Sequence, residues 1–418
     1  MHKLGASIRA NKKIVGFLSG QAISLFGSSL VQFALMWSIV LETDSGMMTA
    51  LYSACSFGPQ ILITLFGGAW ADRYSRKKLI MYADAGIALA TLVLCGLMMG
   101  RDLGYAPIFI IAIIRSFGGG IQSPAVSAVL PQLVEEDQLV RVNSINGVIQ
   151  SAVLLLSPAA AALVIGKLSM PAILLIDVVT AAIAIGILFT IDIPMHERSK
   201  GVGVNMVNDV KEGLVYATGH PFLRRLFFYN VVCNILIVPA AMFTPLFVGR
   251  AYGSDEIYLM LNEMLFFVGG LVGGGVMAVW GGFKNRIVTL AIGFTVFGLA
   301  TSAMGLQPPF PLYLTAMLIA GLTMPCFNAP MMAMLQEKVR LDMMGRIFSL
   351  LQILGSVIML VATLIFGMMS DGAPLGIILV VTGLMMAVAG IALTMDKRML
   401  SEGLPKPPEP APEAEPAQ

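Results

Sequence analysis

The sequence carries little charge for its length. Of its 418 residues, 12% are Asp, Glu, Lys or Arg, whereas 57% are hydrophobic. Soluble domains usually contain about a quarter charged residues, so the composition excludes an ordinary water-soluble domain. It is typical of a polytopic membrane protein. The formal net charge of +2 says little, and the informative feature is where the charges lie.

Residues that carry covalent or metal chemistry are also scarce. The three histidines, His2, His196 and His220, lie outside the long apolar segments. This excludes a histidine proton relay within the membrane, and no Cys/His/Asp cluster predicts a metal site or an embedded catalytic centre. A G-x-x-x-x-G-K-[ST] phosphate loop is absent, which argues against ATP hydrolysis by this chain. We therefore expect no enzyme, no cofactor and no nucleic-acid partner.

The four cysteines and the N-terminal region fit the same class. All four cysteines fall within apolar runs, where buried small side chains are the ordinary interpretation. The first apolar run, from about 14 to 41, follows a basic flank. It is longer than the roughly 7–15 residues of a signal-peptide core. We interpret it as the first membrane helix.

Twelve segments are long enough to cross a bilayer, which takes about 20 apolar residues. Their approximate limits are 14–41, 47–70, 79–99, 105–130, 143–166, 169–191, 222–249, 257–280, 287–305, 312–335, 346–370 and 374–395. With the N-terminus inside, the outer connections hold Arg101, Lys167 and Arg250, and Arg115 lies within a span. The other Lys and Arg residues all fall inside, as the positive-inside rule requires. We expect a multi-pass protein of the bacterial inner membrane with both termini in the cytoplasm.

The longest inner connection divides the chain into two sets of six spans. We expect an N-terminal six-helix bundle over 1–191, a cytoplasmic linker over 192–221 and a C-terminal bundle over 222–400. Apolar residues at helical spacing in the linker predict a short amphipathic helix on the inner membrane surface, with a solvated linker as the alternative. The Pro-, Glu- and Ala-rich segment 401–418 is predicted to be disordered.

The two halves show a weak internal repeat. The stretch AWADRYSRKK aligns with VWGGFKNRIV, which matches Arg76 to Arg286. The stretch GGIQSPAVSAVLPQ is similar to MPCFNAPMMAMLQE, and an offset of 206 residues matches Pro124 to Pro330. Repeats of this kind are typical of transporters that bind their substrate at a midplane site between two halves. The predicted fold is all-α, with twelve transmembrane helices in two pseudo-symmetric six-helix bundles.

The stretch GGAWADRYSRKK, residues 67–78, resembles the signature of the major facilitator superfamily in the turn between the second and third helices. The residues that match are Gly67, Asp72, Arg73, Arg76 and Lys77, whereas Ser75 stands in place of a second glycine. The regions RSFGGGIQSPAVSAVLPQ, LIDVVTA and MLQEKVRLDMMGRIFSL are similar to the macrolide-efflux branch of that superfamily. The similarity extends over about residues 10–395.

The resemblance implies a monomeric secondary transporter that exports amphipathic, macrolide-like drugs. Transport would occur by proton antiport with alternating access, and the partners would be a small-molecule substrate, protons and the lipid bilayer. Export of a siderophore or translocation of a lysophospholipid by the same fold is the alternative. In the span 143–166, SPAAA resembles a degenerate antiporter signature and weakly favours export.

In the superfamily the signature acts as a gating latch. The Asp72 carboxylate would bind the N-terminus of the helix that begins near Arg346, because a helix N-terminus carries partial positive charge and unpaired amide donors. Arg73, Arg76 and Lys77 would hold the turn at the inner surface. The alternative is a basic loop that only sets the topology, which explains the cations but leaves the acid unexplained.

Charged residues within spans are expensive and mark functional sites. Arg115 resembles an arginine associated with proton coupling in the superfamily, and the alternative is pairing with backbone carbonyls. Glu263 is the first candidate for a proton-binding carboxylate, and Asp177 is the second, with interhelical packing as its alternative role. Asp84 is expected to support the Asp72 cluster.

Polar, aromatic and methionine side chains within the spans are candidates for a substrate cavity. Each polar side chain has helix-to-helix hydrogen bonding as its alternative role, and each apolar one has packing or lipid contact. The candidates are Gln21, Phe26, Gln32, Phe33, Trp37, Phe57, Gln122, Asn146, Gln150, Asn230, Asn234, Met242, Phe243 and Asn328.

Overall fold

The computed structural model describes residues 2–98, 104–134, 138–165, 167–193 and 206–404, with the side chains of 2–11, 65–69, 71–73 and 206–210 left undescribed. In these ranges the chain forms helices and no strands. The helices are α1 His2–Thr43, α2 Gly46–Arg73, α3 Arg76–Met98, α4 Ala106–Leu133, α5 Leu139–Val164, α6 Met170–Thr190, α7 Met206–Gly219, α8 Pro221–Met242, α9 Thr244–Tyr252, α10 Glu256–Trp280, α11 Arg286–Gly305, α12 Phe310–Lys338, α13 Leu341–Gly372, α14 Leu375–Met395 and α15 Lys397–Glu402.

Long apolar helices dominate the structure. Eleven of the described helices are long and apolar enough to span a membrane, and α2 adds a further helix of 28 residues. Together they correspond to the twelve predicted spans, so the predicted fold class is confirmed. The chain is a multi-pass membrane protein.

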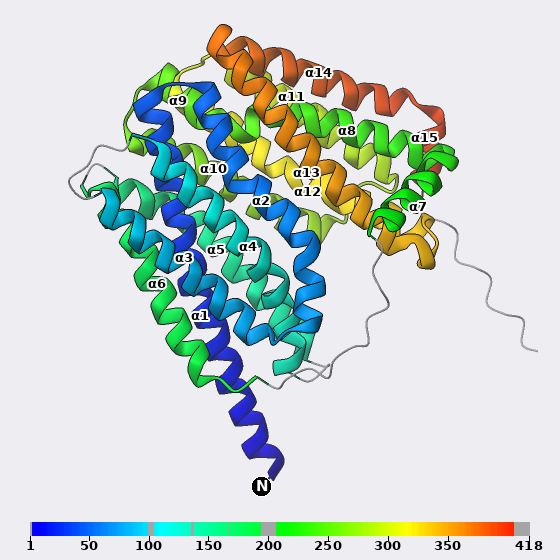
Figure 1. The fold of residues 1–418 in the computed structure, drawn as a ribbon. Coiled ribbons are helices and arrows are strands. Elements are labelled where there is room, and N and C mark those ends of the chain that lie inside the picture. Colours follow the sequence, from blue (N-terminus) through cyan, green and yellow to red (C-terminus); the bar gives the residue numbers. More distant parts are fainter. Residues whose placement is uncertain (1, 99–103, 135–137, 166, 194–205, 405–418) are drawn as a thin grey trace, which may run out of the picture.

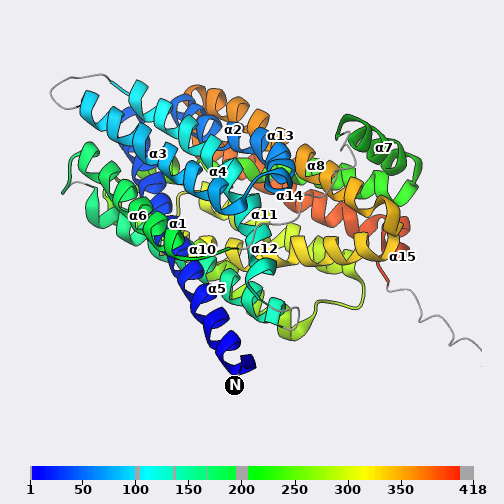
Figure 2. The same cartoon turned by 60° about the horizontal axis from the view of Figure 1, so that its bottom comes forward.

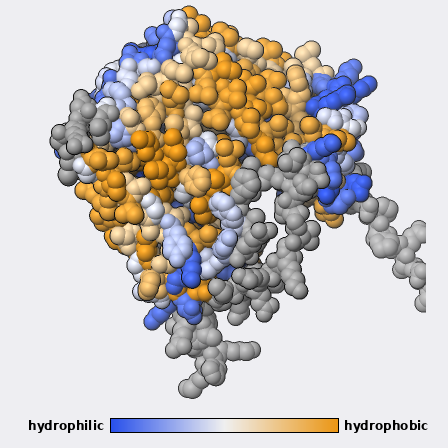
Figure 3. All heavy atoms as spheres, viewed as in Figure 1, coloured by the Kyte–Doolittle hydropathy of each residue, from blue (hydrophilic) through white to orange (hydrophobic). Residues whose placement is uncertain are grey.

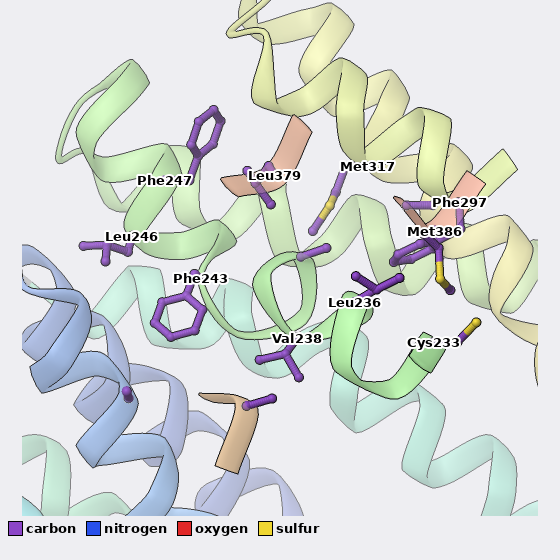
Figure 4. Packing of buried hydrophobic residues seen from close by; sticks show 14 of the residues in the cluster. Cys233, Leu236, Val238, Phe243, Leu246, Phe247, Phe297, Met317, Leu379 and Met386 are labelled. Atoms are coloured by element: carbon purple, nitrogen blue, oxygen red, sulfur yellow. The ribbon is translucent and has the colours of Figure 1, made fainter. Parts of the chain in front are cut away.

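One predicted span is broken. The sequence predicts a continuous helix over 222–249, but α8 ends at Met242 and α9 begins at Thr244. Phe243, at the break, leaves helical geometry with a ψ of 2°. Pro245 lies in the first turn of α9, where the missing amide hydrogen of proline is tolerated. Figure 4 shows the Phe243 ring at this corner among packed hydrophobic side chains.

The helices form two groups that meet along a narrow contact. Figures 1 and 2 show α1–α6 in one group and α8–α14 in the other. The groups contact each other mainly where α2 meets α13 and where α5 meets α10. Hydrophobic side chains cover most of the face seen in Figure 3, and hydrophilic ones gather at its two ends, those around α7 and α15 among them.

The internal repeat has a structural counterpart. Arg76 begins α3 and donates from Nη1 to the Ala128 carbonyl oxygen of α4 at 2.6 Å. Arg286 begins α11 and donates from Nη2 to Glu337 Oε1 of α12 at 2.5 Å. The aligned prolines lie inside α4 and α12. The aligned segments therefore occupy equivalent places in the two groups.

The seam between α11 and α14 is a close helix contact in the second group. A Cβ atom at Gly298 would lie 2.4 Å from the Gly383 carbonyl oxygen, and one at Gly305 would lie 2.5 Å from the Gly376 carbonyl oxygen. Such distances are far below van der Waals contact, so only glycine fits. Small residues at a membrane-helix interface let two backbones approach closely.

The linker helix and the end of the described chain both pack against the second group. A Cβ atom at Gly213 of α7 would lie 3.1 Å from the Arg346 carbonyl oxygen of α13. Ala217 of the same helix is buried, whereas Leu214 is 47% exposed. Helix α15 extends to Glu402 and so enters the segment predicted to be disordered from 401. The Gly403 carbonyl oxygen accepts the Arg286 amide hydrogen at 2.9 Å, and 405–418 lie outside the described residues.

Candidate functional site

A polar cavity of about 250 Å³ lies among α1, α2, α4 and α5. We call it the polar pocket; Gln21, Ala22, Ser24, Leu25, Ser28, Gln60, Gly119, Gln122, Ser123, Val126, Ser127, Asn146, Ile149 and Gln150 line it. Four of the predicted cavity residues, Gln21, Gln122, Asn146 and Gln150, meet here. Amide and hydroxyl groups that converge from several helices can orient a bound molecule by hydrogen bonds.

A second cavity of about 400 Å³ joins the two groups of helices. We call it the bridging cavity; Phe57, Gln60, Ile61, Thr64, Ser123, Gln352, Ile353, Ser356 and Met359 line it. It shares Gln60 and Ser123 with the polar pocket, so the two cavities adjoin. Phe57 also lines, with Met242, a smaller cavity of about 20 Å³. Gln352 and Ser356 went unpredicted, although their spacing of one helical turn was a usable signal.

Several aromatic candidates for the cavity wall belong to the packed core instead. Trp37 and Phe243 have no exposed surface, and Phe26 and Phe33 pack against the same core. Figure 4 shows Phe243 surrounded by apolar neighbours. An aromatic side chain on an apolar helix can face a neighbouring helix or a cavity, and composition does not distinguish these orientations.

The remaining polar candidates lie apart from the described cavities. The Tyr52 hydroxyl donates a hydrogen bond to the backbone carbonyl oxygen of Gln32 at 3.1 Å. Asn234 Nδ2 donates to Asn230 Oδ1 at 3.1 Å, so these two amides bind each other along α8. Asn328 is an exposed residue of α12. The predicted polar residues that meet in a cavity therefore all belong to the first group of helices.

Arg115 and Asp177 form a buried ion pair between α4 and α6. The guanidinium Nη1 binds Asp177 Oδ2, and Nη2 donates to the Ser28 carbonyl oxygen at 2.7 Å. The Ser28 hydroxyl donates to Asp177 Oδ1 at 2.8 Å. The side chains are 12% and 3% exposed. Both charges are therefore neutralised within three helices, next to the pocket wall at Ser28.

Asp84 of α3 is a buried acid of a different kind. It is 4% exposed, and its Oδ1 accepts hydrogen bonds from Gln122 Nε2 at 3.0 Å and from Ser24 Oγ at 3.5 Å. Both donors line the polar pocket. We expected this carboxyl to support the Asp72 cluster, but its bonds place it behind the pocket wall.

Glu263 lies near the start of α10, away from the described cavities. Asn262 Nδ2 donates to Glu263 Oε1 at 3.4 Å, and the Tyr313 hydroxyl donates to Asn262 Oδ1 at 2.6 Å. The Tyr313 ring belongs to an aromatic cluster with Tyr252 and Phe310. The described hydrogen-bond partner of the carboxyl is therefore Asn262, which in turn is bound by Tyr313 of α12.

Three of the predicted latch residues, Arg76, Lys77 and Arg346, have described partners. The side chains of Asp72 and Arg73 lie outside the described residues. Arg76 binds the Ala128 carbonyl, and Lys77 Nζ donates to the Ile191 carbonyl oxygen at 2.6 Å, just beyond α6. A cation at a helix C-terminus is favourable because of the helix dipole. Arg346 Nη1 lies 3.0 Å from Glu212 Oε2 of α7.

At the opposite end of the bundle, Asp371 joins the two groups of helices. Its Oδ1 accepts the Gly46 amide at 2.5 Å, and its Oδ2 accepts the Met47 amide at 2.9 Å and the Ser45 hydroxyl at 3.0 Å. The carboxylate of α13 thus caps the N-terminus of α2, where amide groups lack helical partners. It lies 3.5 Å from Arg250 Nη2.

Arg250 of α9 completes this contact. Its Nε donates to Asp44 Oδ1 at 2.9 Å, and its Nη2 donates to the Asp44 carbonyl oxygen at 2.6 Å. Asp44 has a φ of 46°, a left-handed conformation that Asp tolerates better than most residues. We call Asp44, Arg250 and Asp371 the acidic clamp, and the end of the bundle that holds them the clamped end.

Close backbone contact supports the clamp. A Cβ atom at Gly46 of α2 would lie 1.6 Å from Ser370 Oγ and 2.8 Å from the Gly367 carbonyl oxygen of α13. One at Gly367 would lie 2.3 Å from Ala50 Cβ. The two groups are therefore in direct contact at the clamped end, whereas the bridging cavity separates α2 from α13 farther along.

Comparison with known proteins gives relatives that are transporters. "Macrolide efflux protein A" of Streptococcus pyogenes is 28% identical over 356 residues, which cover 84% of this chain and 88% of the relative. The protein of that name from Enterococcus faecalis is 29% identical over 70% of this chain and 90% of its own length. The "Multidrug efflux pump Tap" of Mycobacterium tuberculosis is 24% identical over 84% of both chains.

Solved structures share the fold. A bacterial homologue of the human lysosomal transporter Spinster, in an inward-facing and unoccupied conformation, superimposes with a TM-score of 0.71 at 12% identity and covers 96% of this chain and 99% of that one. A bacterial homologue of the iron transporter ferroportin, in an inward-facing state, gives 0.66 at 14% identity and covers 92% of this chain and 98% of that one. The sequence profile of the Major Facilitator Superfamily matches residues 17–363. The chain therefore belongs to the major facilitator superfamily of membrane transporters.

Proposed function

We propose that this protein exports amphipathic organic compounds, macrolide-like antibiotics among them, by proton antiport with alternating access. The observation that carries the proposal is the bridging cavity, which is lined by both groups of helices and adjoins the polar pocket. Its walls combine apolar residues such as Phe57 and Met359 with amides and hydroxyls. Such a surface suits a large, mostly apolar molecule that carries a few polar groups.

The acidic clamp supports alternating access. It holds the two groups of helices together at one end, while the cavities lie beyond it toward the other end. We propose that the clamped end faces the outside of a bacterial inner membrane and that both termini face the cytoplasm, in agreement with the positive-inside rule. The structure then corresponds to an inward-facing state of a monomer.

Rocking of two six-helix units would exchange this state for an outward-facing one. We propose that 1–191 and 222–400 form the two units and that 192–221 connects them. Closing the inner end would bring the turn that contains Asp72 to the start of α13, where its carboxylate could cap that helix. Arg346 would then exchange Glu212 for Asp72.

Proton coupling requires an acid that both sides of the membrane reach in turn. We propose that the Arg115–Asp177 pair holds α4 and α6 in register beside the pocket and forms part of the proton path. Glu263 is a second proton-binding candidate, in the other group of helices.

The function is testable in everted membrane vesicles from a strain that expresses the full chain. We expect radiolabelled erythromycin to accumulate inside the vesicles when a proton gradient is imposed, and to leak out when an uncoupler is added. Vesicles from a strain with the empty vector are the control. Equilibration without accumulation indicates a channel, and accumulation that persists with the uncoupler contradicts proton antiport.

A further inference from the structure

A surface cavity of about 500 Å³ lies between the linker helix α7 and the start of α13. We call it the linker cavity; Lys211, Glu212, Val215, Tyr216 and Met343 line it. Val215 is 64% exposed although it is apolar, and the ring centroids of Tyr216 and His220 lie 4.2 Å apart. The linker cavity shares no lining residue with the polar pocket or the bridging cavity, so substrate binding in those cavities does not account for it.

The charged side chains around the linker cavity leave one cation uncompensated. Glu212 Oε2 lies 3.0 Å from Arg346 Nη1, and Asp342 Oδ2 lies 2.8 Å from Arg340 Nη2. Lys211 is exposed and forms no ion pair with an acid in the described part of the chain. The surface therefore combines aromatic and apolar side chains with a net positive charge, which attracts a partner that carries carboxylates.

The segment that follows the last described residue has complementary chemistry. Residues 405–418 read PKPPEPAPEAEPAQ, with six prolines, three glutamates and one lysine. Proline-rich segments favour the polyproline II helix, which repeats every three residues, and aromatic-lined grooves recognise such helices. At that repeat one row is apolar throughout and another holds two of the acids. The first row is Pro408, Ala411, Ala414 and Ala417, and the second is Lys406, Glu409, Pro412, Glu415 and Gln418.

This segment begins close enough to reach the linker cavity. Glu402 of α15 binds Lys338 Nζ, and that ammonium lies 4.8 Å from the centre of the Phe222 ring. Two residues beyond Lys338, the Arg340 amide donates to the Tyr216 hydroxyl of α7 at 3.4 Å. Two residues of backbone span at most about 8 Å, whereas the segment 405–418 spans about 43 Å as polyproline II. Figures 1 and 2 show α7 and α15 at the same end of the second group.

We propose that residues 405–418 dock in the linker cavity of their own chain. The apolar row packs against Val215 and the rings of Tyr216 and His220, and a glutamate of the other row binds Lys211. Composition predicts disorder for the segment by itself, and segments of that kind order when they bind. Because the segment is attached beside its site, its effective concentration is on the order of millimolar, and weak contacts are enough to hold it. This docking is separate from the proposed transport function.

Binding of the segment as a separate peptide tests the docking. The receptor is a purified variant that ends at Leu404 and so keeps every described residue, and the probe is a synthetic peptide with the sequence of 405–418. Thermophoresis of the labelled receptor should show saturable binding with a Kd of about 0.1 mM. The full-length chain should bind the peptide roughly tenfold more weakly, because its own segment competes at an effective concentration of about 1 mM.

Substitutions on both partners locate the contact. In the truncated receptor, Lys211→Gln should raise the Kd of the peptide about two- to fivefold, as expected for one exposed ion pair, and Tyr216→Ala should raise it about tenfold. Lys284→Gln is the matched control, because Lys284 is another exposed lysine without a described ion pair, and it should leave the Kd unchanged. A peptide with Glu409→Gln, Glu413→Gln and Glu415→Gln should bind the unsubstituted receptor about fivefold more weakly.

Three results would overturn the docking. The first is a truncated receptor that does not bind the peptide, or binds it no more tightly than the full-length chain does. The second is binding that both Lys211→Gln and Tyr216→Ala leave unchanged. The third concerns an anionic lipid, the other occupant that this charge attracts: phosphatidylglycerol vesicles that bind the full-length and truncated proteins equally, and lose that binding in Lys211→Gln, would assign the cavity to the membrane surface.

Discussion

Asp371→Asn should open the clamped end. The substitution removes the charge from a group that accepts the Gly46 and Met47 amides and the Ser45 hydroxyl and that lies beside Arg250. A hydrogen bond to a charged group contributes about 1.5–3 kcal/mol and a neutral one about 1 kcal/mol. A carboxylate at a helix N-terminus adds about 0.3–1 kcal/mol.

The solvent exposure of Asp371 lowers the free energy that the closed clamp is expected to lose on substitution. Its side chain is 36% exposed, so solvent screens the charge and the lower part of each range applies. The loss is then about 1.5–2.5 kcal/mol for the closed clamp. Because about 1.4 kcal/mol corresponds to a tenfold change, the ratio of open to closed clamped ends should rise about 10- to 70-fold.

Distance measurements between spin labels can detect that change. Labels at Glu42→Cys and Ser254→Cys would report on exposed residues that flank the clamp in the two groups of helices, with the four native cysteines replaced. Asp371→Asn should add a longer distance that is rare in the parent. Asp255→Asn is the matched control, because Asp255 caps the Ile257 amide of its own helix α10. An unchanged distance distribution in Asp371→Asn would refute the role of the clamp.

Three further predictions concern packing, pH and the buried ion pair. Gly46→Ala should open the clamped end as Asp371→Asn does, since its Cβ would lie 1.6 Å from Ser370 Oγ, whereas Gly345→Ala, with nothing within 4 Å, should leave the label distances unchanged. Partial burial raises the pKa of Asp396, but hydrogen bonds from the Met399 amide and Arg225 outweigh it and lower the pKa below its ordinary value. Its contribution is therefore complete above the ordinary Asp pKa and is lost as pH falls through the lowered value, so Asp396→Asn should reduce Tm at pH 7 more than at pH 3. Arg115→Leu alone should lower the stability by about 3–5 kcal/mol and reduce the yield of folded protein. Arg115→Leu combined with Asp177→Leu should restore most of that yield, as size-exclusion profiles would show. Equal yields of the single and double variants would contradict a buried pair.

The sequence predicted the spans well because they depend on local composition. Apolar length identifies a span. An amide within a span, such as that of Gln122 or Asn146, must face a cavity or hydrogen-bond to another helix, because lipid offers it no partner. The break at Phe243 was missed because membrane helices tolerate nearby prolines such as Pro245 without breaking.

The orientation of side chains and the contacts between distant segments were not predictable. Trp37 and Phe57 both lie in apolar helices, yet one is fully buried and the other is 38% exposed and lines a cavity. A span that is apolar on every face carries no periodicity that indicates its rotation. The pairing of Arg250 with Asp44 joins residues 206 positions apart, and it depends on which connections meet at one end of the bundle.

The glycine seam between α11 and α14 limits how this protein can change shape. Backbones that touch at Gly298 and Gly383 have no side chains that could change rotamer and allow the helices to slide. Deformation within that pair is therefore unfavourable, and α11 and α14 should move together as one rigid body. The freedom needed for each transport cycle then falls on polar joints, which break and re-form at little cost, such as the one around Arg250.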